Sequence, residues 1–163
     1  MTHTKKLTIM AMFTAIGIVG AAFIWFPALI ARAYPIQHMV NVLAAVLLGP
    51  IPALLIAFMI GLLRNLLGLG TVLAFPGGMI GALLAGVFYR WSNKTWAAAV
   101  GEVIGTAVIG AIVAVPIVTL FFGDPVAIFA FVPGFLISSS IGAFLAILIL
   151  KRWRPDWGPA GER

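Results

Sequence analysis

The chain has few charged residues, no cysteine and only two histidines, and each shortage excludes a class of protein. Lys, Arg, Asp and Glu make up 9% of its 163 residues, and hydrophobic residues make up 63%. Soluble domains contain about 25% charged and about 45–50% apolar residues. A domain of this size buries about 70% of its surface, and ten basic and four acidic side chains cannot cover the remainder. The composition excludes a water-soluble enzyme and a disordered chain, and it indicates a polytopic membrane protein.

The absence of cysteine excludes a disulfide framework and cysteine-ligated metal ions or clusters. The two histidines, His3 and His38, lie far apart in the sequence, so no histidine-rich metal site is indicated. The sequence also has no GxxxxGK[ST] phosphate-binding loop, no HExxH motif and no GxSxG motif. We therefore expect a chain that is not an enzyme and that holds neither a metal nor a cofactor.

The apolar runs predict an all-α membrane protein. A spanning helix needs about 20 apolar residues, and Gly and Pro interrupt the shorter runs. We count six transmembrane helices in one domain over residues 1–154, followed by a short polar tail over 155–163. The six runs cover approximately residues 7–30, 37–48, 53–67, 77–89, 96–122 and 128–150.

The basic residues lie at the ends of these runs, and seven of the ten fall on one proposed side of the membrane. Because Lys and Arg favour the cytoplasmic side, we predict that both termini are cytoplasmic and that the net charge of +6 reflects topology rather than nucleic-acid binding. The predicted inner residues are Lys5, Lys6, Arg90, Lys94, Lys151, Arg152 and Arg154, with an inner aromatic belt of Trp91, Trp96, Trp153 and Trp157. The predicted outer loops hold Arg32 and Asp124, with Trp25 and Tyr34 as the outer belt.

A cleaved signal peptide is an alternative for the start of the chain, because Ala31-Arg32-Ala33 resembles a cleavage site. The first apolar run is about 24 residues long, however, whereas the apolar region of a signal peptide has about 7–15. We therefore favour an uncleaved multi-pass protein of the prokaryotic plasma membrane.

Polar side chains inside a bilayer are costly and indicate functional sites. At 1.5 Å per residue, Arg64 lies about 20 Å beyond the turn at Gly49-Pro50, in the outer third of the membrane, and Asn65 follows it. His38 and Asn41 share one helix face. With Gln37 and Tyr34 just above, these side chains predict one outward-facing polar layer. The alternatives are an Arg64 that snorkels to headgroups or bonds to carbonyls, and a His38–Asn41 pair that only joins two helices.

Three further groups bear on this layer. Glu102 lies about 9 Å from the inner surface, so we expect a structural carboxylate, or a role in coupling or binding, without an ion pair to Arg64. Of Ser138, Ser139 and Ser140, at most two face a cavity, and back-bonding to the helix is the alternative. Phe75 precedes a helix start whose free N–H groups are able to meet a ligand, and a helix start without a ligand is the favoured alternative. Trp25, Tyr34 or Phe75 would supply an aromatic slot for the ligand.

Ala11 and Ala15, in the first predicted helix, have the spacing of small residues at which another helix packs closely.

Six stretches of the chain carry a resemblance to a known family. They are residues 11–15 in the first helix and, in the more specific part, residues 26–27, 34–43, 47–50, 61–71 and 74–77. With the small size and six spans, they resemble the ThiW-type substrate-binding S component of an energy-coupling factor (ECF) transporter, which is assigned to the thiazole precursor of thiamine.

This resemblance implies high-affinity binding of hydroxyethylthiazole, or a closely related thiamine-pathway compound, from the outside. It implies as partners a transmembrane T component, which would contact Ala11 and Ala15, and two ATPase subunits that hydrolyse ATP. The loop over about residues 27–36 would act as a lid. A stand-alone channel or facilitator, an S component for another vitamin and a structural membrane protein without a ligand remain alternatives.

Overall fold

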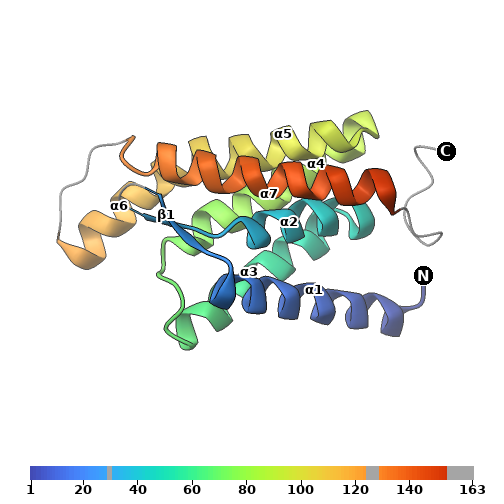
Figure 1. The fold of residues 1–163 in the computed structure, drawn as a ribbon, viewed down its shortest axis with the longest axis horizontal. Helices are drawn as coiled ribbons and strands as arrows, with labels where there is room; N and C mark the ends of the chain where they lie inside the picture. Colours follow the sequence, from blue (N-terminus) through green and yellow to red (C-terminus); the bar gives the residue numbers. More distant parts are fainter. Residues whose placement is uncertain (29–30, 124–128, 154–163) are drawn as a thin grey trace.

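Six helical segments run back and forth along one long axis in the computed structural model, which describes residues 1–28, 31–123 and 129–153 (Figure 1). The segments are α1 (His3–Phe23), α2 (Pro35–Leu48), α3 (Pro50–Leu66), α4 (Ala74–Ser92), a continuous segment of α5 (Thr95–Val103), the π-helix η1 (Ile104–Gly110) and α6 (Ala111–Phe122), and α7 (Val132–Arg152). The predicted helical fold is confirmed, with six helical segments, whereas six membrane spans and cytoplasmic termini stay predictions. Three of them, His3–Phe23, Thr95–Leu120 and Val132–Arg152, are long and apolar enough to cross a membrane, whereas α2 and α3 have 14 and 17 residues.

The first helix ends earlier than the sequence predicts. Instead of continuing to residue 30, α1 ends at Phe23, and strand β1 (Phe26–Ala28) pairs antiparallel with strand β2 (Ala31–Ala33). Pro27 lacks a backbone N–H and disfavours a helical residue before it, so the chain becomes extended at this point. The two-stranded hairpin is the one departure from an all-α description among the residues that the structure describes.

Short turns at one end of the bundle place the helices side by side. Gly49, at φ +92°, joins α2 to α3, and Pro50 occupies the first turn of α3, where its missing N–H is tolerated. Asn93, at φ +54°, ends α4 two residues before α5 begins. The first residues of α1 and the last of α7 lie at this same end (Figure 1).

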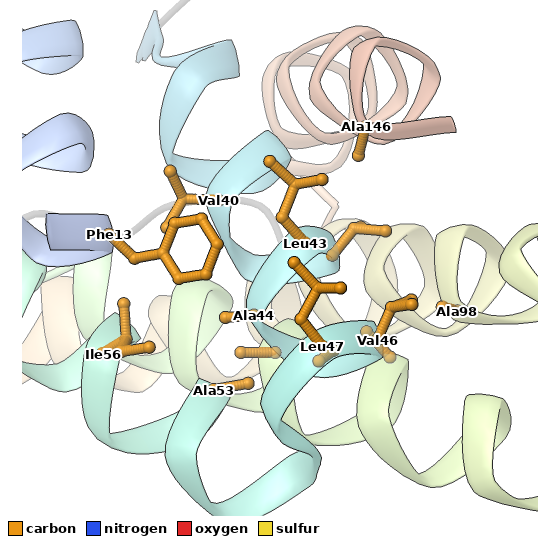
Figure 2. Packing of buried hydrophobic residues seen from close by; sticks show 14 of the residues in the cluster. Phe13, Val40, Leu43, Ala44, Val46, Leu47, Ala53, Ile56, Ala98 and Ala146 are labelled. Atoms are coloured by element: carbon orange, nitrogen blue, oxygen red, sulfur yellow. The ribbon is translucent and has the colours of Figure 1, made fainter. Parts of the chain in front are cut away.

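Helix α2 forms the centre of the apolar core. Figure 2 shows Val40, Leu43 and Leu47 of α2 surrounded by side chains from the neighbouring helices. These neighbours are Phe13 of α1, Ala53 and Ile56 of α3, Ala98 of α5 and Ala146 of α7. Large apolar side chains also cover the outside of the bundle, where Phe23 is 82% and Leu120 is 81% exposed. Apolar surfaces on both sides of the helices are what a lipid environment requires.

Glycines bring α4 and η1 into backbone contact. A Cβ atom on Gly105 would lie 2.7 Å from the Cα of Gly81, so neither position has room for a side chain. Small residues permit such close approach between membrane helices, and π-helical turns occur frequently at functional sites. The close contact holds Glu102 and Thr106 directly against α4.

Candidate functional site

A cavity of about 510 Å³ is lined by elements at the end of the bundle opposite the first residue of α1. The hairpin, the start of α2, the α3–α4 connection, η1 and the start of α7 enclose it. Its lining residues are Pro27, Arg32, Tyr34, Gln37, His38, Arg64, Gly68, Leu69, Gly70, Thr71, Leu73, Gly77, Gly78, Thr106, Phe131, Phe135 and Ser138. Five predicted binding residues therefore line a common cavity: Tyr34, Gln37, His38, Arg64 and Ser138.

The floor of the cavity contains an imidazole held by a buried carboxylate. Nδ1 of His38 lies 2.7 Å from Oε1 of Glu102, and Glu102 is fully buried. The same Oε1 accepts hydrogen bonds from Asn41 Nδ2 at 3.0 Å and from Thr106 Oγ1 at 3.1 Å. A carboxylate bonded to one ring nitrogen fixes the orientation of an imidazole and leaves the other nitrogen for a ligand.

The floor is also tied to the first turn of α4. Asn41 Nδ2 donates to the carbonyl of Gly78 at 3.1 Å, and Thr106 Oγ1 donates to the carbonyl of Gly77 at 3.0 Å. Gly77, Gly78 and Thr106 all contribute to the cavity lining. Side chains from α2 and the fifth helical segment thus converge on the backbone of α4.

Glu102 lies at a different height from the one estimated from the sequence. That estimate placed Glu102 near the inner surface, apart from the outer polar layer. Helix α2 has 14 residues, so Asn41 lies only about 12 Å above the turn at Gly49. Glu102 lies about 10 Å above the start of α5 by the same rise. The two side chains therefore meet at one height, because α2 is too short to keep His38 and Asn41 near the outer surface.

Arg64 forms the cavity wall near the hairpin. Its Nη1 donates to Oε1 of Gln37, and its Nη2 donates to the carbonyl of Leu69 at 3.3 Å. The guanidinium carbon lies 3.7 Å from the centre of the Tyr34 ring, whose hydroxyl also donates to Leu69 at 3.0 Å. These contacts fix the last turn of α3 to the start of α2.

Ser138 connects α7 to the start of α2, since its Oγ accepts the N–H of Tyr34 at 2.8 Å. Ser139 is buried and donates to the carbonyl of Phe135 at 2.7 Å, and Ser140 is exposed. Of the three consecutive serines, one thus lines the cavity.

Five predicted binding residues lie outside the cavity lining. Asn41 is buried beneath the floor, and Asn65 donates to the carbonyls of Gly61 and Thr71 at 2.8 and 3.1 Å. Trp25 is 43% exposed under the guanidinium group of Arg32. The other two are Phe75, whose ring packs against that of Phe58, and Ser139.

The sequence reasoning missed two aromatic residues of the lining, Phe131 and Phe135. Their ring centres lie 5.9 Å apart on successive turns. The spacing of four residues was the available signal, but it does not stand out in a run of apolar residues. Thr106, four residues after Glu102, was also missed, because a single threonine does not stand out in an apolar run either.

A second, apolar cavity of about 460 Å³ lies between α1 and α3 on the outside of the bundle. Ala11 and Ala15 both line it, and both are exposed. The remaining lining is Leu7, Met10, Thr14, Ile18, Leu55, Ile56, Met59 and Leu63. The two alanines thus lie on an accessible apolar groove.

Several predictions concern residues outside the described ranges. They are Asp124, Arg154, Trp157 and the polar tail over 155–163. Across residues 1–28, 31–123 and 129–153, no three His, Asp or Glu side chains gather as a metal site would require.

Comparison with known proteins gives one family. The family model described as "Thiamine-precursor transporter protein (ThiW)" matches residues 7–155, which is most of the chain. No curated protein matches the chain.

Proposed function

Because the chain belongs to the ThiW family of thiamine-precursor transporter proteins, we propose that it is the substrate-binding S component of an ECF importer for hydroxyethylthiazole. The observation that carries the proposal is the cavity with His38 and Glu102 at its floor. The elements that line it lie at the end of the bundle opposite the first residue of α1 (Figure 1), which is the outer side of the prokaryotic cell membrane in the proposed topology with both termini cytoplasmic.

The cavity suits a small, flat, neutral ligand. Its volume of about 510 Å³ lies within the range of about 300–1,000 Å³ that is usual for ligand pockets. Phe131 and Phe135 supply an apolar wall for a thiazole ring. With Nδ1 bonded to Glu102, Nε2 of His38 remains for a hydrogen bond with the ligand hydroxyl.

Six transmembrane helices with both termini inside fit the arrangement of the basic residues. Lys5, Arg90, Lys94 and Arg152 lie at or near helix ends that share one side of the bundle. The hairpin of β1 and β2 lies at the other side and contributes Pro27 and Arg32 to the cavity, as expected of a lid.

The apolar groove between α1 and α3 is the proposed docking surface for the T component. Ala11 and Ala15 leave room there for a helix of the partner to approach closely. Two ATPase subunits bound to that partner would supply the energy, since this chain has no phosphate-binding loop of its own.

Uptake of labelled hydroxyethylthiazole tests this function. Cells that express the chain together with a T component and two ATPases should accumulate the compound in an ATP-dependent manner, and the four proteins should copurify. Equal uptake by the chain alone would instead identify a channel or facilitator. Uptake of another vitamin without hydroxyethylthiazole would contradict the assigned substrate.

A further inference from the structure

Arg64 is a buried cation on the wall of the cavity. Its side chain is at the end of α3, and the residue is 2% exposed. Gln37 and the carbonyl of Leu69 accept hydrogen bonds from its Nη atoms, and the Tyr34 ring covers the guanidinium group. Its Nε has no hydrogen-bond partner among the described residues. All the partners that the structure gives to Arg64 are therefore neutral.

No carboxylate in the described part of the chain contacts this cation. Glu102 is the only acidic residue within those ranges, and its Oε1 is occupied by His38, Asn41 and Thr106. Arg32 adds a second cation at the cavity wall, although it is exposed. A ligand group placed beside Arg64 thus meets a cation that no carboxylate of the described residues pairs with, and buried surroundings screen that charge weakly.

We infer that Arg64 makes the cavity select ligands by charge, so that it binds neutral and anionic thiazoles and rejects cationic thiazolium compounds. The inference rests on the proposed function, because the precursor contains a neutral thiazole whereas thiamine contains a thiazolium cation. Like charges placed close together in a desolvated site oppose binding. An importer with this cavity discriminates the precursor from the finished vitamin by charge.

Three probes that differ in charge test the inference on the purified, intact chain. They are hydroxyethylthiazole, its phosphate ester and its N-methylated thiazolium. For the wild-type protein, the thiazolium should bind at least about tenfold more weakly than the neutral compound, and the phosphate at least as tightly as the neutral compound.

Two variants separate charge from shape. Arg64→Gln removes the charge, and Gln37→Glu places a carboxylate next to an unchanged Arg64, where Oε1 of Gln37 already accepts its hydrogen bond. Both should reduce the discrimination against the thiazolium to about threefold or less, which is within about 0.7 kcal/mol. Arg64→Lys keeps the charge and should keep the discrimination. Because Gln37→Glu retains Arg64, it decides the matter even if Arg64→Gln does not fold.

The outcomes distinguish this inference from the proposed function. Equal binding of the neutral and cationic compounds by the wild-type protein overturns the inference and leaves the function intact. Discrimination that is unchanged in Gln37→Glu also overturns it, since steric exclusion of the methyl group would then be the cause. If no thiazole binds the wild-type protein, both the function and the inference fail.

Discussion

Removal of the Glu102 carboxylate should weaken ligand binding more than it weakens the fold. In the structure, Glu102 Oε1 meets three groups, but two of them have a second partner. Asn41 also donates to the Gly78 carbonyl, and Thr106 also donates to the Gly77 carbonyl. Only Nδ1 of His38 depends on Glu102 among the hydrogen bonds that the structure gives it.

The expected magnitude follows from that difference. In Glu102→Ala, one buried ring nitrogen loses its partner, which costs about 1–3 kcal/mol. Because Glu102 positions the ring for the ligand, we expect this loss to appear in ligand binding, where it corresponds to an increase of about 5- to 150-fold in Kd. The effect on the free energy of unfolding should be smaller, because Oε2 of Glu102 has no partner among the described residues and its burial opposes folding.

Calorimetric titration of the detergent-purified variants with hydroxyethylthiazole measures this effect, and thermal unfolding measures stability. Glu102→Gln retains an oxygen that accepts the Nδ1 proton of His38, so its affinity should fall less than that of Glu102→Ala. A Kd for Glu102→Ala within twofold of wild type would refute the positioning role. A parallel loss of affinity and folded protein would assign Glu102 to the fold alone.

Three further predictions test other parts of the structure. Gly81→Ala should destabilise the protein by about 1–3 kcal/mol in thermal unfolding, because its Cβ would lie 2.8 Å from Oε2 of Glu102; an unchanged melting temperature would contradict the close packing of α4 and η1. Bulky residues at Ala11 and Ala15 should abolish ATP-dependent uptake but spare ligand binding, and loss of binding would argue against a docking role. Asn65→Ala should lower stability by about 1 kcal/mol, since two backbone carbonyls lose a donor, while an altered ligand Kd would place Asn65 in the site.

Much of the helical arrangement could be predicted from apolar runs and their breakers. Gly49 and Asn93 end helices, and Pro50 begins one, within a few residues of the predicted boundaries. The hairpin was not predicted, because residues 26–33 are as apolar as the helix before them and only Pro27 signals the change. Residue composition does not reveal a strand pairing that depends on contacts outside the segment.

The site was predicted in part because polar residues stand out in an apolar chain. His38, Gln37 and Arg64 were identified in this way, and the structure brings them to one cavity. Contacts between distant helices could not be predicted from the sequence. Glu102 lies 64 residues from His38, and its height relative to His38 depends on the length of α2. Apolar lining residues such as Phe135 cannot be distinguished from the lipid-facing residues around them.

The central claim is that the cavity above His38 binds the thiazole precursor, and one paired titration tests it most directly. Wild-type protein, His38→Ala and His3→Ala are titrated with hydroxyethylthiazole; His3 is an exposed histidine at the start of α1 and serves as the matched control. The account predicts that wild type and His3→Ala bind alike and that His38→Ala binds at least about tenfold more weakly, which corresponds to about 1.4 kcal/mol. Equal affinities for all three proteins, or no binding by the wild-type protein, would contradict it.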